Sequence, residues 1–504
     1  MKQIIEKLER YCPDNADDIM RFFQKTASTF TLEQWRELWE KLLSSDNEYM
    51  KMVFLWECMV KDLTTDKLEK YTEALLYTKA FNWEQKYYMH WQVVRLLFGK
   101  SSLGNDKINE MIYENYHNIL HEFMNELDGL SLVNDRDDSL VLVTVQQFLD
   151  MQHGPTKTTL DRASVISRKL GKNVMIVNTA ELYGGRNPGI RSVYIGGYCS
   201  ELSNVETYAY DDITFPFIQF DDNMPNVFNA QEFINFVRKY KPSYIVNIGD
   251  CSLLIDACSK VVPVIDINTV PSGLGMSEST AIVIGRELKD SDSRFLEKLG
   301  KTTDYIIRGR FTSSLKEQTH TYTRSELGIP EERFVIAVVG GRLRDELDNE
   351  FLDMLEEILN DGALLCIIGN MENYYEVCEK RDVIRKNSIY LGMQDDVLAI
   401  FENCDLYVNP KRKGGGTSVI EAMSKGIPAV TLDYGDVALG AGKDFCVKTY
   451  EEMKSVISEY ISNEKLYNQM SLKARERAEY MLDSDTAFTE ILGEFEKRYL
   501  AKCN

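Results

Sequence analysis

The sequence predicts an α/β protein in which an α-helical domain precedes two doubly wound, Rossmann-like domains. Only three of the 30 glycines (Gly99, Gly104 and Gly129) lie in the first 130 residues, as expected of a helical segment, because glycine weakens helices. From about residue 139, short β-branched runs alternate with amphipathic segments, which is typical of a parallel sheet with crossover helices. The same alternation starts again after residue 330. We therefore expect domains at 1–130, 131–330 and 331–480, and a C-terminal helix at 481–504 that packs back toward the cleft between the two α/β domains.

The first 130 residues carry a helical apolar pattern. Thr31 and Gln34 have the spacing of a capping box, and an apolar stripe follows at helical intervals: Leu32, Trp35, Trp39 and Leu42. All five tryptophans of the chain lie in this segment. We expect them to form the core of a helical bundle. The alternative is a surface for a protein acceptor or a second subunit, since tryptophan is enriched at such contacts.

The first α/β domain is predicted from four apolar, β-branched runs with amphipathic segments between them. Its strands are expected at 140–145, 173–177, 244–248 and 262–267, and its helices at 159–170, 230–240 and 252–260.

The second α/β domain repeats this order. Its strands are expected at 334–339, 363–368, 389–391, 405–408 and 429–432, and its helices at 348–359 and 396–401. The segment 464–502 is helical and highly charged. Because ligands of open α/β sheets bind beyond the carboxyl ends of the strands, two such domains in tandem predict a ligand cleft between them.

Composition excludes several classes of partner. With 79 acidic and 58 basic residues, the net charge of −21 disfavours nucleic acid and anionic membranes. The ten cysteines are scattered singly, as expected of reduced core residues. The first residues are charged, and no apolar run is long enough to cross a bilayer. We therefore expect a cytoplasmic protein without stable membrane insertion.

Residues 409–430 are the most informative segment. They read as a strand end, three basic residues, three glycines, a short helix and another strand. Glycines allow a ligand to approach the backbone, and the N-terminus of a helix attracts anions through its unpaired N–H groups and its dipole. Glu421 falls one turn into the helix, where its carboxylate could accept hydrogen bonds from sugar hydroxyls. The segment therefore predicts a site for a nucleotide sugar.

Five short motifs in the second domain follow one another in a recognisable order. They are Gly340-Gly341-Arg342-Leu343, Ile368-Gly369-Asn370, Leu391-Gly392, Cys404-Asp405-Leu406-Tyr407-Val408-Asn409-Pro410, and Glu421-Ala422-Met423 followed by Gly426-Ile427-Pro428. In this order they resemble GT-B glycosyltransferases, in particular family four, also known as glycosyl transferases group 1. The helical segment before Gly129 lies outside the resemblance.

The resemblance implies a GT-B fold and a role for each matching position. Arg342 would face the donor diphosphate, and Glu421 would hold the ribose. The other donor-binding positions are Asn370, Leu391, Gly414, Gly415, Gly416, Thr417 and Ser418. Arg342 also makes physical sense, because a guanidinium can neutralise a leaving diphosphate without a metal ion. The alternative for Arg342 is an ordinary surface charge at a strand end.

The chain departs from the family pattern at one position. The family has two glutamates separated by seven residues, and Lys413 stands where the first would lie before Glu421. The family's usual second lysine after Arg342 is missing, so Lys413 is expected to clamp the diphosphate in its place. This resembles the protein O-linked N-acetylglucosamine transferases, which leaves both an inverting and a retaining outcome open. Alternatively, the basic residues 411–413 are simply solvated.

The facing domain offers acceptor-side candidates. His153 lies in a loop that opens a helix after the first strand of that domain, and its titration range suits a general base. Alternatively, it is a structural histidine. Gly154 and Thr156 in the same loop, and Ser272 in a later loop, are the other expected acceptor-side residues. The loop 434–437 is expected to contact the donor sugar.

No metal site and no cofactor are expected. Asp-x-Asp pairs occur three times, at 135/137, 290/292 and 483/485, but none of them directly ends a predicted strand.

The leading hypothesis is therefore a metal-independent hexosyltransferase that moves a sugar from a nucleoside diphosphate, expected to be UDP, to a hydroxyl on a protein. The first alternative acceptor is a polysaccharide or a lipid-linked glycan. The second alternative is a catalytically silent GT-B module that supports an active partner, and an epimerase or a phosphorylase is a weaker one. An oligomer formed through the helical domain is a further hypothesis.

Overall fold

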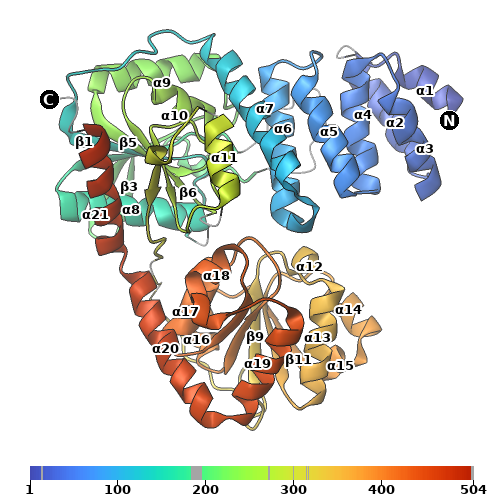
Figure 1. Cartoon of the computed structure of the whole chain (residues 1–504), viewed down its shortest axis with the longest axis vertical. Helices are drawn as coiled ribbons and strands as arrows, with labels where there is room; N and C mark the ends of the chain where they lie inside the picture. The colour runs from blue at the N-terminus through green and yellow to red at the C-terminus, as the bar shows by residue number, and fades with distance from the viewer. Residues whose placement is uncertain are drawn as a thin grey trace.

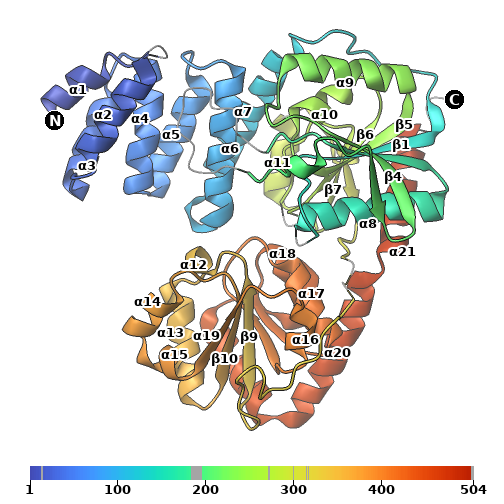
Figure 2. The same cartoon turned by 180° about the vertical axis from the view of Figure 1, so that it is seen from behind.

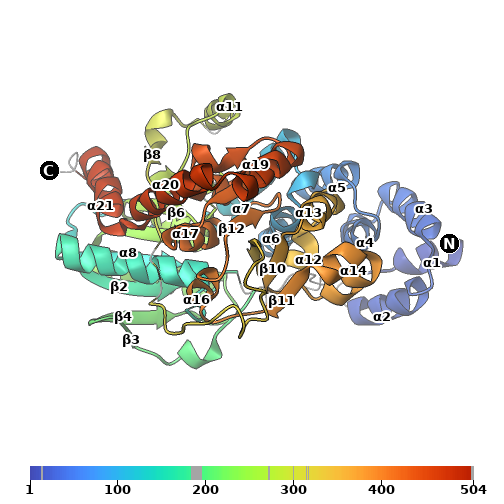
Figure 3. The same ribbon diagram turned by 90° about the horizontal axis from the view of Figure 1, so that it is seen from below.

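The structure is a computed structural model of the 504-residue chain, and it describes residues 1–12, 15–151, 153–182, 196–270, 273–298, 300–313, 315 and 317–500. It has three parts (Figure 1). An array of helices, α1 to α7, extends from one side of an α/β unit that contains β1 to β8, here called the N-lobe. A second α/β unit, the C-lobe, contains β9 to β14 and lies beneath both the N-lobe and the helical array (Figures 1 and 3).

The helical array consists of stacked helices, and the N-termini of α3 to α7 are capped by polar side chains. Its helices are α1 (Lys2–Leu8), α2 (Ala16–Ala27), α3 (Leu32–Leu43), α4 (Glu48–Lys61), α5 (Thr65–Tyr77), α6 (Trp83–Gly99) and α7 (Asp106–Met124). The capping box predicted at Thr31 and Gln34 is present at the start of α3. Four tryptophans are buried, namely Trp35, Trp39, Trp56 and Trp83, which confirms the predicted core role over a surface role for these residues.

The N-lobe sheet has the strand order β3-β4-β2-β1-β5-β6-β7-β8. Every pairing is parallel except β3 with β4. The strands are β1 (Asp137–Val145), β2 (Asn173–Asn178), β3 (Thr207–Tyr210), β4 (Ile213–Gln219), β5 (Pro242–Gly249), β6 (Val264–Asn268), β7 (Ala281–Ile284) and β8 (Ile306–Arg308).

Helices cover both faces of this sheet (Figure 2). The N-lobe helices are α8 (Gly154–Leu170), α9 (Val227–Tyr240), α10 (Leu253–Cys258) and α11 (Asp290–Lys298). One face packs with α9, α10 and the helices α6 and α7 of the array in a shared apolar cluster, which includes Trp83 and Tyr87. The other face packs with α8 and the C-terminal helix α21. The helical array is therefore joined to the N-lobe through a common core.

The C-lobe is built around a parallel sheet with the order β11-β10-β9-β12-β13-β14. Its strands are β9 (Val335–Gly340), β10 (Leu364–Gly369), β11 (Ser388–Gly392), β12 (Leu406–Asn409), β13 (Ala429–Leu432) and β14 (Cys446–Val447). Its helices are α12 (Leu343–Glu346), α13 (Asn349–Asn360), α14 (Tyr374–Lys380), α15 (Asp382–Lys386), α16 (Val397–Phe401), α17 (Gly416–Ser424), α18 (Gly435–Ala441), α19 (Tyr450–Ser462) and α20 (Glu464–Leu482).

The predicted fold class, two doubly wound α/β domains after a helical segment, is confirmed. Each predicted strand is present within three residues of its expected bounds. Other features differ from the sequence-based expectation. The sequence did not reveal the β3–β4 hairpin, the strands β7, β8 and β14, or the helices α11, α14, α15, α18 and α19. In addition, α8 begins at Gly154 rather than at 159, with Pro155 in its first turn. The segment expected as one long helix forms α20 and α21 (Ser484–Phe495), joined at Asp483.

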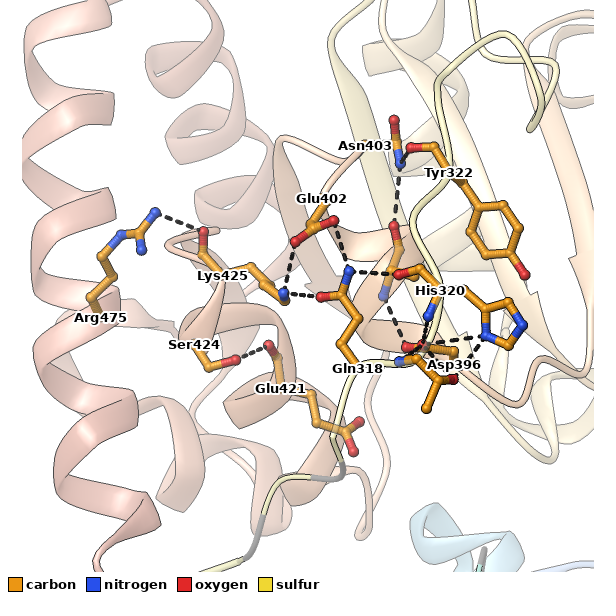
Figure 4. A network of polar contacts seen from close by, with 12 residues as sticks. Gln318, His320, Tyr322, Asp396, Glu402, Asn403, Glu421, Ser424, Lys425 and Arg475 are labelled. Carbon is orange, nitrogen blue, oxygen red and sulfur yellow. Dashed lines mark hydrogen bonds and ion pairs between the residues drawn. The ribbon is translucent and has the colours of Figure 1, made fainter.

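Two chain segments connect the lobes. At Asp483 the chain leaves α20, which packs on α17, and enters α21, which packs on α8 of the N-lobe. The other connection follows β8, and its residues 317–322 are fixed to the C-lobe by a polar network (Figure 4). In this network Asp396 accepts hydrogen bonds from the backbone N–H groups of Thr319 and His320, at 2.6 and 2.8 Å.

Among the described residues, the structure has no helix with the length and apolar character needed to cross a membrane.

Candidate functional site

The glycine loop connects the carboxyl end of β12 to α17. Gly415 is the N-terminal flanking residue of α17 and has a φ of 98°, a conformation that side chains disfavour. A Cβ atom at Gly415 would lie 2.7 Å from Nη2 of Arg412 and 2.9 Å from Cγ2 of Val437. Only glycine fits this position without a shift of its surroundings, and the loop therefore presents bare backbone at the start of the helix.

Arg412 is the buried support of this loop. Its side chain is 6% exposed and lies beneath the glycines. The guanidinium donates to Oδ1 of Asn409 at 2.8 Å, to Oε2 of Glu346 at 2.8 Å and to the carbonyl oxygen of Val339 at 2.7 Å. This arrangement contradicts the alternative in which all three basic residues 411–413 are solvated, because Arg412 is a structural cation that ties β12 to β9 and α12.

Arg342 precedes α12 and is more accessible than Arg412. Its side chain is 48% exposed, and Nη2 donates to Oε1 of Glu346 at 3.1 Å. Glu346, whose side chain is only 5% exposed, therefore binds two arginines at once, one buried and one near the surface. Because the second arginine already neutralises the carboxylate, the exposed N–H groups of Arg342 can meet an anion beside the glycine loop.

Lys413 is half-buried next to the first glycine of the loop. Burial lowers the pKa of its ammonium, and the nearby Asp436 partly opposes this shift. The backbone fixes the segment, because the N–H of Asp436 donates to the carbonyl oxygen of Lys413 at 2.7 Å. Among the described residues, the structure gives the Lys413 ammonium no hydrogen bond or ion pair. A partly desolvated cation of this kind gains when an anion binds.

The first turn of α17 contains the other predicted donor-binding positions. Thr417 is exposed, whereas the hydroxyl of Ser418 is held inside the fold by the carbonyl oxygen of Gly415 at 3.0 Å and the hydroxyl of Tyr407 at 2.8 Å. Glu421 is half-buried, and its carboxylate points away from the network around Glu402 (Figure 4).

Asn370 and Leu391 lie at the carboxyl ends of the neighbouring strands β10 and β11, and both are half-buried. Asn370 is part of the backbone junction below Arg342, because its carbonyl oxygen accepts the N–H of Leu343 at 3.0 Å. The structure thus brings the predicted C-lobe residues to one edge of one sheet.

The predicted acceptor-side residues lie at the start of α8 in the N-lobe. His153 is the N-terminal flanking residue of this helix, and its Nδ1 is 3.0 Å from the hydroxyl oxygen of Thr156. That hydroxyl oxygen is buried and also accepts the N–H of Leu149 at 2.8 Å. Gly154, between them, is exposed. Ser272, the fourth predicted residue of this group, lies outside the described residues.

His153 is a neutral imidazole at physiological pH. The pKa of His153 is lowered to about 4, chiefly by burial; Asp150 opposes this shift and Arg95 adds to it. A base with this pKa is weak at pH 7, since general bases work best near their own pKa. The low pKa thus favours hydrogen bonding over full proton removal as the role of His153.

One helix of the array reaches both groups of candidate residues. Arg95, in the last turns of α6, is close enough to His153 to affect its pKa. Phe98, one helical turn later, has its ring centroid 4.6 Å from Cζ of Arg342. The sequence analysis missed Phe98, Arg95 and the role of Glu346. Glu346 could have been found from the sequence, because it lies four residues after Arg342, one helical turn away. Phe98 and Arg95 could not, because contacts between distant segments leave no pattern in the spacing of residues.

Among the described residues, no three His, Cys, Asp or Glu side chains are grouped as a metal site would require.

The comparisons with known proteins agree with this geometry. Residues 321–477 match the family model described as glycosyl transferases group 1. The structure is similar to a mutant form of the Thermobaculum terrenum O-GlcNAc transferase, with a TM-score of 0.57 and 14% identity over 100% of this chain and 98% of that chain. It is also similar to the Anabaena protein HepE in complex with UDP, with a TM-score of 0.50 and 12% identity over 71% of this chain and 99% of that chain. No curated protein matches the sequence.

At these identities the structural likeness concerns the fold. The chain has a GT-B fold, and the C-lobe segment that carries the sequence motifs matches the family model of glycosyl transferases group 1. The likeness to the Thermobaculum protein covers the helical array as well as the two lobes.

Proposed function

We propose that this protein is a glycosyltransferase that moves a hexose from UDP to a hydroxyl group on a protein. The observation that carries the proposal is the convergence at one edge of the C-lobe sheet of a bare helix N-terminus, an accessible Arg342 and a half-buried Lys413. A diphosphate is bound by backbone N–H groups that donate hydrogen bonds to its oxygens and by cationic side chains that neutralise its charge. The match of residues 321–477 to glycosyl transferases group 1 supports the same reading.

In the proposed reaction, the bond between the sugar carbon and the diphosphate oxygen breaks, the acceptor hydroxyl oxygen bonds to that carbon, and the hydroxyl proton passes to the departing diphosphate or to solvent. Negative charge then accumulates on the leaving UDP. Arg342, Lys413 and the N–H groups at the start of α17 oppose this charge, and interactions that strengthen as charge develops accelerate the reaction. We assign this role to cationic side chains and therefore propose a metal-independent enzyme that needs no cofactor beyond its donor substrate.

Other residues are proposed to orient the substrates. The carboxylate of Glu421 would accept hydrogen bonds from ribose hydroxyls, and Asn370 and Leu391 would lie beside the nucleoside. On the N-lobe, Nε2 of the neutral His153 would orient the acceptor hydroxyl, with Gly154 leaving room for it. The loop at 434–437 would face the donor sugar.

The acceptor is proposed from the arrangement of the helical array. The array extends beside the N-lobe, and its helix α6 contacts the C-lobe at Arg342, so a bound polypeptide could follow it to the glycine loop (Figure 1). The similarity of the whole chain to a protein named O-GlcNAc transferase supports this choice. The described cysteines are free thiols, which is typical of a reducing compartment and supports a cytoplasmic location. Self-association through the array remains a hypothesis.

The test combines donor turnover with a matched pair of variants. The wild-type protein should release UDP from at least one UDP-sugar, faster when a protein acceptor is present. Lys413→Ala should weaken UDP binding by about tenfold to a hundredfold, the value of one or two hydrogen bonds to a charged group. Lys411→Ala removes the same charge from an exposed neighbour and should have little effect. Equal effects of the two variants would remove Lys413 from the site.

The replacement of a family glutamate by Lys413 also favours a second candidate, a GT-B module that binds the donor without turning it over. Tight UDP binding without any UDP release from common UDP-sugars, with or without protein, polysaccharide and lipid-linked acceptors, would support the silent module over the enzyme.

A further inference from the structure

Phe98 is an aromatic residue whose contacts are unusual for its position. It lies in the last turn of α6, which is held at its other end by Trp83 and Tyr87 in the core shared with the N-lobe. Phe98 itself is half-buried, yet it belongs to none of the apolar clusters formed by the described residues. Its ring is therefore not used to stabilise the core of the helical array.

The contacts of this ring are made with the candidate diphosphate site. The guanidinium of Arg342 stacks on the ring, with 4.6 Å between Cζ and the ring centroid. A Cβ atom placed on Gly414, the first glycine of the loop, would lie 3.7 Å from Cζ of Phe98 and 3.9 Å from Nη2 of Arg342. Phe98, Arg342 and Gly414 thus meet at one point, where a residue of the helical array touches the glycine loop of the C-lobe.

We propose that Phe98 is a positioning residue of the donor site, which acts by orienting Arg342 toward the diphosphate. This inference rests on the proposed function of Arg342 as a diphosphate ligand. Stacking occupies the flat face of the guanidinium and leaves its N–H groups, which lie in the plane, available as donors. One of them reaches Glu346 at 3.1 Å. The aromatic face and the carboxylate together fix the plane of the guanidinium, and the remaining donors are held beside Gly414.

The energetic role of the ring follows from the exposure of Arg342. A half-exposed arginine on a flexible stem loses rotamer freedom when it binds a ligand, and a stacked neighbour reduces this loss by restricting the side chain beforehand. A cation–π contact at such a site contributes enough to change binding by about two- to fivefold. The effect of Phe98 should therefore be moderate, specific for the diphosphate and dependent on Arg342.

The ring also connects parts of the chain that are far apart in sequence. Phe98 belongs to the helical array, which shares a core with the N-lobe, whereas Arg342 belongs to the C-lobe. Arg95, three residues before Phe98 on the same helix, acts electrostatically on His153. The end of α6 therefore contacts the donor-side arginine and influences the acceptor-side histidine, so the helical array contributes a side chain to the site.

The experiment is a double-mutant cycle with UDP as the probe, measured by isothermal titration calorimetry on the full chain. Phe98→Leu keeps an apolar side chain but removes the aromatic face, and it should weaken UDP binding by about two- to fivefold. Phe98→Tyr keeps the face and should bind UDP as the wild type does. In an Arg342→Ala background, Phe98→Leu should have no further effect, because the group through which it acts is absent.

The chain provides a matched control in Phe22 of α2. Phe22 is also half-buried and outside the apolar clusters, and its ring centroid lies 3.8 Å from Nζ of Lys7. Its helix α2 lies near the other end of the array from α6 (Figure 1). Phe22→Leu should leave UDP binding unchanged.

Two results would overturn the inference while the proposed function stands. In one, the wild type binds UDP and Arg342→Ala weakens this, but Phe98→Leu behaves like Phe22→Leu. In the other, Phe98→Leu weakens binding equally with and without Arg342. If the wild type itself does not bind UDP, the proposed function fails, and the role of Phe98 fails with it.

Discussion

Arg412 illustrates how a single residue can shape a site without touching its ligand. Its guanidinium reaches Asn409, Glu346 and the backbone of Val339, and it fills the space left by the absent side chain of Gly415. A buried charge of this kind is retained in a fold only if it is fully paired. The glycine loop and Arg412 are therefore one structural unit, and the loss of either should deform the other.

This gives a prediction about stability. Arg412→Met should destabilise the C-lobe by about 3–5 kcal/mol, because Glu346 keeps a buried charge with one partner fewer. Arg344→Met removes an exposed pair with Glu372, 3.1 Å long, and should cost less than about 1 kcal/mol. Urea denaturation should be followed by circular dichroism, because all five tryptophans lie in the helical array and fluorescence would miss the C-lobe. Equal losses for the two variants would contradict the structural role of Arg412.

A second residue, Glu181, makes the stability of the N-lobe depend on pH. Glu181 is 3% exposed and accepts hydrogen bonds from the backbone of Leu254 at 3.2 Å, from the hydroxyl of Thr179 at 3.0 Å and from Ser252. Burial raises the pKa of Glu181 from 4.5 to about 7, although these hydrogen bonds oppose the shift. The folded state thus binds the proton more tightly than the unfolded state. The contribution to stability is complete below pH 4.5 and is lost as the pH rises toward 7.

Glu181→Gln should remove this dependence, because the amide does not titrate. Relative to the wild type, the variant should gain about 3 kcal/mol of unfolding free energy between pH 4.5 and pH 7, and the difference should stay constant above pH 7. Thermal denaturation of both proteins at several pH values measures it. Groups that do not interact with Glu181 affect both proteins alike, and the nearby buried Asp256, which raises the pKa of Glu181, is the group that does interact with it. Parallel stability curves over this range would show that Glu181 is ionised in the folded protein.

At the residue scale, the sequence predicted the members of the site better than their surroundings. Arg342 was proposed from the order of the motifs, and Lys413 because it replaces a glutamate of the family pattern. The structure brings both residues to the glycine loop. Their roles remain predictions. Arg412 could not be separated from its basic neighbours, because three consecutive charges look alike in sequence. Its burial, its hydrogen bonds and the packing of Gly340 and Gly415 against its guanidinium distinguish it in the structure.

At the scale of elements, the junction of β12 with α17 is the feature on which donor binding depends. Gly415→Ala should place a side chain against Arg412 and Val437 and force a non-glycine residue into a left-handed conformation, at a cost of about 1–3 kcal/mol. Gly362 after α13 provides a control, because its φ is 107° but a Cβ there would meet no atom within 4 Å. Both substitutions to alanine should lower the melting temperature. Only Gly415→Ala should also weaken UDP binding, by tenfold or more, in calorimetric titrations.

Should Gly415→Ala and Gly362→Ala bind UDP equally well, the glycine loop would not be the donor site. An effect of Gly415→Ala on stability alone would point to a structural loop.

The elements that the sequence predicted correctly are those with strong local signals. The buried parallel strands are continuous apolar runs, and β13 lies at the expected residues, 429–432. The β3–β4 hairpin was missed because its strands are only partly buried and lack the continuous apolar runs of the buried parallel strands. The break between α20 and α21 was missed because Asp483, which caps α21 through the N–H of Thr486, stands in an otherwise helical sequence. Helical periodicity alone does not show where one helix ends and the next begins.

At the scale of the whole molecule, the three parts are coupled by contacts that no local pattern reveals. Tyr116 of α7 donates to Asp256 of α10 at 2.5 Å and fixes the helical array to the N-lobe. Asp396 fixes the connecting segment to the C-lobe (Figure 4). Phe98 then places the array against Arg342. The sequence predicted the order of the parts, but their arrangement depends on contacts between residues that are far apart in the chain.

The measurement that tests the account most directly is the crystal structure of the full chain bound to UDP. We predict the β-phosphate within hydrogen-bonding distance of the N–H groups of Gly416 and Thr417, with Arg342 and Lys413 on either side of the diphosphate. Density for UDP at another place, or a diphosphate that lies beyond hydrogen-bonding distance of both Arg342 and Lys413, would contradict the central claim that this loop is the donor site.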